Sequence, residues 1–130
     1  MQSSEHAKKV VQCLNELVPT LQEVAENTAV LLQEGNLAHG YRELQSLIEA
    51  LQHFEGGLSF LHTAGFLRDT RLGHLKEKLH EVYPSILAAL QEQDSVRLAD
   101  VLQYELAQTL ATYRSGGDAL DESGLGIFSS

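Results

Sequence analysis

The sequence has little of what builds disulfide-linked, metal-linked or membrane-spanning proteins. Its one cysteine, Cys13, excludes an internal disulfide bond and any cysteine-cluster metal site. No run of apolar residues reaches the ~18 that a membrane-spanning helix needs. The amino-terminal residues MQSSEHAKKVV also lack the charged and then apolar order of a signal peptide. We therefore expect a cytoplasmic protein.

Basic residues are few as well. Nine lysines and arginines stand against 18 acidic residues, which gives a formal net charge of −9. A nucleic-acid-binding protein normally gathers lysine and arginine on one face, whereas the basic residues here are scattered along the chain. The same excess of acid disfavours binding to anionic membrane surfaces. We expect neither nucleic acid nor membrane as a partner.

The short motifs of common enzymes are also missing. The chain contains no Gly-x-Ser-x-Gly elbow, no phosphate-cradling glycine loop and no Gly-x-Gly-x-x-Gly fingerprint. We therefore expect a protein that is not an enzyme and that has no catalytic residue and no cofactor.

What the chain does contain is apolar residues at helical spacing. Hydrophobic residues make up 43% of 130 residues, which suffices for one domain with its own core. Apolar residues recur every three to four positions in four stretches, and turn-forming residues lie between them. We expect long helices over residues 4–34, 37–63, 70–91 and 95–114. Because the connections are short, neighbouring helices should be antiparallel, and the predicted fold class is an all-α, antiparallel four-helix bundle.

Two prolines and one pair of glycines lie inside these predicted helices. At 100° per residue, Pro19 and Pro84 both fall on the side of their helix that faces away from the apolar stripe. A proline on that side removes one backbone hydrogen bond and kinks the helix outward, so we expect both helices to continue through it. Gly56-Gly57 costs about 2 kcal/mol of helix propensity relative to alanine. A continuous helix and a break at this pair remain alternatives.

The ends of the predicted helices carry typical capping residues. Gly35 is expected to end the first helix in a left-handed conformation, and Asn36 to cap the second. The next two helices each have two candidate caps, Asp69 or Thr70 and Asp94 or Ser95.

The stretch 95–114 is the most regular of the four and carries more apolar surface than one core face needs. Its main stripe consists of Leu98, Ala99, Leu102, Leu106, Thr109, Leu110 and Tyr113. Val96, Val101 and Tyr104 fall outside this stripe. We interpret these three residues as an exposed or shared surface and as candidate protein-interaction residues.

Residues 115–130 differ in composition from residues 1–114, which we take as the bundle domain. The segment SGGDALDESGLGIFSS is acidic and rich in glycine and serine, so we expect a flexible tail. Its end nevertheless carries Leu125, Ile127 and Phe128. These three residues are further candidates for an interaction, either with the bundle or with a partner.

Histidine and glutamate spacings raise the alternative of a metal site. Glu77-x-x-His80 matches the spacing found in di-iron bundles, but such a site needs a second motif and two further inward glutamates. Glu77 and His80 lie off the apolar stripe, and His39, Glu49 and His53 also lie on polar sides of their helix. We therefore expect no metal site at these residues. A metal- or small-ligand-binding bundle that uses histidine and glutamate stays the alternative function.

One segment of the fourth helix resembles a known pattern. The run from Leu98 to Leu106 reads L-A-D-V-L-Q-Y-E-L, and it is similar to an L-A-D-x-L-x-Y-E-L segment of small helical proteins of Gram-positive bacteria that carry no assigned activity. Gln103 stands where those proteins have an acid, and Ala107-Gln108 where a proline is expected. The resemblance implies a helical bundle and no catalytic residue.

The predicted function is a non-enzymatic interaction module. The motivation is the surplus apolar surface on the fourth helix together with the apolar end of the tail. The partner would be another protein or a second copy of the chain, in an adaptor-like or chaperone-like role. That comparison with adaptors and chaperones rests on analogy of fold.

Overall fold

The computed structural model of this chain describes residues 2–68 and 70–115, and these residues form an all-α, antiparallel four-helix bundle. The predicted fold class is confirmed. Helix α1 spans Gln2–Gln33, α2 spans Leu37–Thr63 and α3 spans Arg71–Gln91. The fourth helix consists of three consecutive segments, α4 (Ser95–Asp100), the π-helical η1 (Val101–Leu106) and α5 (Ala107–Ser115).

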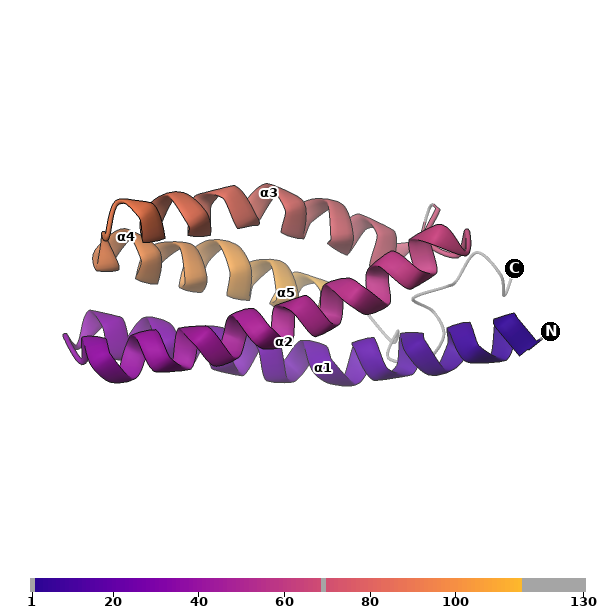
Figure 1. Cartoon of the computed structure of the whole chain (residues 1–130), viewed down its shortest axis with the longest axis horizontal. Helices are drawn as coiled ribbons and strands as arrows, with labels where there is room; N and C mark the ends of the chain where they lie inside the picture. The colour runs from indigo at the N-terminus through magenta and orange to yellow at the C-terminus, as the bar shows by residue number, and fades with distance from the viewer. Residues whose placement is uncertain (1, 69, 116–130) are drawn as a thin grey trace.

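Figure 1 shows these helices side by side, with the turns from α1 to α2 and from α3 to α4 at one end of the bundle. The connection from α2 to α3 lies at the other end, near the amino terminus. Three hydrogen bonds join α1 to the fourth helix, Gln33 to Gln103 at 2.8 Å, Arg114 to Gln22 at 2.9 Å and Tyr113 to Asn15 at 2.5 Å. The end of α1 is thus joined to the first half of the fourth helix, and the middle of α1 to its last residues, so these two helices are antiparallel.

The helix ends follow from residues that can satisfy free backbone groups or adopt a left-handed turn. Gly35, with a φ of 80°, ends α1 as expected. Thr70 and Asp94 cap α3 and α4, since their side-chain oxygens accept hydrogen bonds from the backbone N–H of Gly73 and Arg97, each at 3.0 Å. Asn36 occupies the cap position of α2, but its side chain makes no capping hydrogen bond. The N-cap position predicted for Asn36 is therefore confirmed, but the side-chain hydrogen bond of a cap is not formed.

Both prolines lie inside continuous helices, as predicted. Pro19 is inside α1 and Pro84 inside α3, where Pro84 is exposed and Pro19 is partly exposed. Helix α2 also continues through Gly56-Gly57, which resolves the two alternatives in favour of one helix. Gly57 has a packing reason to be glycine, because a Cβ atom there would lie 2.7 Å from Cδ2 of Leu14 on α1. The low helix propensity of the two glycines is therefore offset by the close packing of α2 on α1 at Gly57.

The core runs along the whole length of α1. This helix contacts α2 on one flank and all three segments of the fourth helix on the other. The largest completely buried side chains include Phe54 of α2, Leu79 of α3 and Leu102 of η1. Burial of the apolar surface of these helices stabilises the fold by about 25 cal/mol per Å², and it is the main force that holds the bundle together.

Val101 corrects the prediction that all three extra apolar residues of the fourth helix form a free surface. Its side chain is buried, with 4% of its surface exposed. The fourth helix lies between α1 and α3 and contacts both, so it buries a wider arc than a helix with one neighbour. Val101 lies in this wider arc and belongs to the core.

Candidate functional site

The four helices do not pack equally tightly around the bundle. With α4, η1 and α5 taken as one helix, α1 packs closely against its two neighbours, and α3 packs closely against the fourth helix. The contact between α2 and α3 is the least extensive of the four adjacent pairs. Helices α2 and α3 are therefore the most loosely packed neighbours in the bundle.

An apolar groove of about 370 Å³ follows the seam between α2 and α3. Seven of its lining residues are leucine or isoleucine, and they come from both helices: Leu44, Leu47, Ile48, Leu51, Ile86, Leu87 and Leu90. The remaining three are Gln52, Glu55 and Tyr83. Among the described residues that line this groove, Glu55 alone carries a formal charge. This surface is suited to an apolar ligand with few polar contacts.

The rim of the groove is formed by residues of α2 and α3 that lie beside the buried stripe of each helix. Ile48, Gln52 and Glu55 are spaced at i, i+4 and i+7 on α2, and Tyr83, Leu87 and Leu90 have the same spacing on α3. Leu87 leaves 56% of its surface exposed, whereas Ile48 and Leu90 are partly buried. Because the partly exposed Ile48 and Leu90 line the same groove, the exposed leucine is part of an apolar patch rather than an isolated surface residue.

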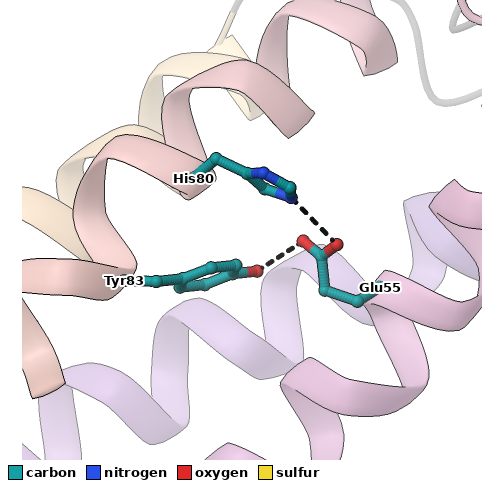
Figure 2. A network of polar contacts seen from close by, with 3 residues as sticks. All are labelled: Glu55, His80 and Tyr83. Carbon is teal, nitrogen blue, oxygen red and sulfur yellow. Dashed lines mark hydrogen bonds and ion pairs between the residues drawn. The ribbon is translucent and has the colours of Figure 1, made fainter.

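A polar cluster closes one end of the groove (Figure 2). The hydroxyl group of Tyr83 donates a hydrogen bond of 2.6 Å to one carboxylate oxygen of Glu55, and Nε2 of His80 lies 3.3 Å from the other oxygen. Glu55 is on α2 and the other two residues are on α3, so the cluster joins the two helices across the seam. Its side chains are accessible, with 24% exposure for Glu55 and 52% for His80.

The surroundings of Tyr83 keep its hydroxyl group protonated. Burial raises the pKa of Tyr83 far above its ordinary value, and the hydrogen bond and negative charge of Glu55 raise it further. The tyrosine is therefore a fixed hydrogen-bond donor to Glu55 at physiological pH. A carboxylate can accept about four hydrogen bonds, so Glu55 keeps capacity for a further donor.

A second, more polar groove of about 660 Å³ lies on the other side of α3, against η1 and α5. Arg71 lies at one end of it, with its guanidinium carbon 4.6 Å from the centre of the Tyr113 ring and with Nη2 donating to the backbone oxygen of Tyr113. Burial raises the pKa of Tyr113 to about 12, although the charge of Arg71 acts in the opposite direction. Arg71 and Tyr113 thus connect α3 to the end of α5.

The three predicted interaction residues that the structure describes do not form one site. Val96 and Tyr104 are exposed, at 72% and 62%, and Tyr104 lines the polar groove. Val101 is in the core. Neither Val96 nor Tyr104 lines the apolar groove. The other three candidates, Leu125, Ile127 and Phe128, lie outside the described residues, as does the tail from residue 116 onward.

The apolar groove was missed in the sequence, although a signal for it exists. Leu87 extends a second apolar row beside the buried stripe of α3, in the same way that Val96 and Tyr104 lie beside the stripe of the fourth helix. Glu55 gave no such signal, because only the fold brings it next to Tyr83 and His80.

The histidines show no grouping that favours the metal-site alternative. Among the residues that the structure describes, no three histidine, cysteine, aspartate or glutamate side chains are placed to hold one metal ion. His39, His53 and Glu77 are exposed, and His80 contacts Glu55. Cys13 is an exposed free cysteine.

The helix lengths and hydropathies also bear on membranes. Within residues 2–68 and 70–115, no helix combines the length and the apolar character needed to cross a bilayer.

The fold and its grooves define an all-α bundle domain with an apolar groove between α2 and α3 and, among the described side chains, no group of three placed to hold a metal ion. Residues 9–115 match the model of a family described as a domain of unknown function, DUF8042, and the chain belongs to this family. The matched range ends at the residue where α5 ends. No curated protein and no solved structure gives a significant match to the chain.

Proposed function

We propose that this chain is a non-enzymatic protein-interaction module and that the groove between α2 and α3 is its binding site. One observation carries the proposal: an apolar groove lies between two helices, and Leu87 on its rim leaves 56% of its surface exposed. A partner that covers the exposed half of Leu87 gains about 1 kcal/mol from this side chain alone.

The shape of the groove favours a helix as the binding element. The lining residues of α2 extend from Leu44 to Glu55, which is about 16 Å of helix at 1.5 Å per residue. A partner helix of three turns spans this length. Its apolar residues at i, i+3 or i+4 and i+7 would then meet the leucines and isoleucines on both sides of the seam, which is a common mode of peptide recognition.

A designed helical peptide tests this function. The peptide presents leucines at i, i+3, i+4 and i+7, has an uncharged glutamine-rich polar face, and is titrated into the isotopically labelled protein. Amide chemical-shift changes should concentrate on Leu51, Ile86 and Leu87 and their neighbours. Calorimetry of the same titration gives the affinity.

Two substitutions of exposed apolar residues provide the comparison. Leu87→Gln places an amide in the groove and should weaken peptide binding at least fivefold. Val96→Gln makes a similar change at the more exposed position outside the groove and should leave binding unchanged. The proposed function is wrong if the peptide causes no shift changes in the groove, or if the two variants behave alike.

A second copy of the chain would be one such partner. Light scattering at micromolar concentration decides this, because a groove-mediated homodimer becomes a monomer in Leu87→Gln and persists in Val96→Gln. The expected cytoplasmic location and the expected lack of a nucleic-acid partner stay predictions.

A further inference from the structure

The charge of the residues that line the groove indicates which charge a partner should carry. Glu55 is the one charged residue among the described residues that line it, and it lies at the end where α2 faces His80 and Tyr83. No described lysine or arginine lines the groove. A partner helix that fills the groove therefore places its residues next to a carboxylate that, among the described residues, is paired with His80 and with no lysine or arginine.

The carboxylate of Glu55 is held in position before any partner binds. The Tyr83 hydroxyl group contacts one of its oxygens and His80 the other, so the side chain cannot turn away into solvent without losing both contacts. About a quarter of the side chain is exposed. A preorganised, partly buried carboxylate with spare acceptor capacity matches a lysine ammonium or an arginine guanidinium group.

The net charge of the whole protein also favours a cationic partner. With a formal net charge of −9, the protein attracts cations at long range and repels acidic segments. On α3, Lys78 lies 3.9 Å from Glu81 with both side chains mostly exposed, and it lines the polar groove on the other side of the helix. This surface pair does not neutralise Glu55.

From these observations we propose that the partner of the α2–α3 groove is a cationic amphipathic helix. Its leucine-like face packs on the apolar floor, and a lysine or arginine one turn beyond its last apolar anchor pairs with Glu55. This inference rests on the proposed function and adds the chemistry of the partner to it.

Three peptides with one apolar face and different polar faces test the inference. The first carries lysines, the second is the glutamine-rich peptide described above and the third carries glutamates. The lysine peptide should bind the full-length protein about tenfold more tightly than the neutral peptide, and the glutamate peptide more weakly than either. Added salt should reduce the advantage of the lysine peptide, because part of it is long-range attraction.

Two charge-removing substitutions separate the groove contact from the overall charge. Glu55→Gln keeps an oxygen that can accept the Tyr83 hydrogen bond, and it should lower the affinity for the lysine peptide about fivefold while the affinity for the neutral peptide stays the same. Glu49→Gln removes an equal charge from an exposed position of α2 that does not line the groove. It should change the affinity for the lysine peptide less than twofold. Thermal unfolding of each variant by circular dichroism verifies that the bundle is intact.

The outcomes distinguish this inference from the proposed function. If the three peptides bind equally well, or if Glu55→Gln and Glu49→Gln act alike, the cationic partner is wrong while the groove remains a binding site. If no peptide binds in the groove, both ideas fail. If the lysine peptide binds only to a chain that ends at residue 115, the chain's own residues 116–130 occupy the groove and the inference is overturned.

Discussion

The two adjacent glycines of α2 allow a sharp test of how this bundle is packed. Gly56→Ala and Gly57→Ala make the same chemical change at neighbouring positions of one continuous helix. Each exchange gains about 1 kcal/mol of helix propensity. The surroundings differ. Apart from its chain neighbours and the nearby backbone of α2, no atom lies within 4 Å of a Cβ built at Gly56, whereas one built at Gly57 lies 2.7 Å from Cδ2 of Leu14 and 3.2 Å from its Cγ.

The contact at Gly57 determines the expected magnitude. Carbon atoms pack best at about 3.5–4.0 Å, so Leu14 or the backbone of α2 must move by roughly 1 Å. Leu14 is 4% exposed and has little room for such a movement. Overpacking of this kind costs about 1–3 kcal/mol. Gly56→Ala should therefore stabilise the protein by about 1 kcal/mol, and Gly57→Ala should destabilise it by as much as about 2 kcal/mol.

Urea unfolding followed by circular dichroism measures both free energies. A double substitution then tests the physical reason, because Leu14→Ala removes the atoms that the new methyl group would meet. In that background Gly57→Ala should become as favourable as Gly56→Ala, even though Leu14→Ala alone costs about 2–5 kcal/mol. Equal stabilisation by both alanines in the wild-type background would refute the close approach of α1 and α2 at Gly57.

Three further predictions concern the hydrogen bonds and caps that hold the fourth helix and α3. Tyr113→Phe removes the buried hydrogen bond to Asn15 and should lower the free energy of unfolding by about 1–3 kcal/mol, as measured by urea titration. Thr70→Ala removes the cap of α3 and should cost about 1 kcal/mol, whereas Thr70→Ser keeps the oxygen that accepts from Gly73 and should recover most of it. Stability should also fall as the pH rises from about 10 to about 12, because an unfolded tyrosine ionises near 10 while folded Tyr113 keeps its proton up to about 12. Tyr113→Phe should make this fall shallower, and an unchanged pH profile would contradict the raised pKa of Tyr113.

Periodicity predicts the helices of this chain well because most of its apolar residues serve one core. The stripes of α1 and α3 keep their phase across Pro19 and Pro84, and this phase correctly indicated helices that continue. The same method could not decide the fate of Gly56-Gly57. Helix propensity argues against continuation there, whereas the contact of Gly57 with Leu14 that compensates for it exists only in the fold.

Two features of the fourth helix could not be predicted by placing its residues at a uniform 100° per residue. The six residues of η1 are π-helical, so successive side chains there turn by a different angle from those of α4 and α5. The number of helices that contact the fourth helix also affects which residues are buried. Because this helix lies between α1 and α3, it buries residues such as Val101, which a single apolar stripe does not include. Tyr104 and Val96 remained exposed as expected from their place on the helix.

The candidate site depends on pairing between helices, which spacing within one helix does not report. Leu87 could have been recognised as an apolar residue beside the stripe of α3. The sparse contact between α2 and α3, by contrast, is a property of the packed bundle and is not visible in either helix alone. Glu55 became a site residue only because this packing places it opposite His80 and Tyr83.

The position of α1 between α2 and the fourth helix has a consequence for synthesis on the ribosome. The hairpin of α1 and α2 joins segments that are neighbours in sequence, so it can form early. The other flank of α1 is covered by residues such as Tyr113, whose partner Asn15 was made 98 residues before it. Until that part of the chain emerges, α1 presents a long apolar strip to its surroundings, and the nascent protein is most prone to aggregation in this interval.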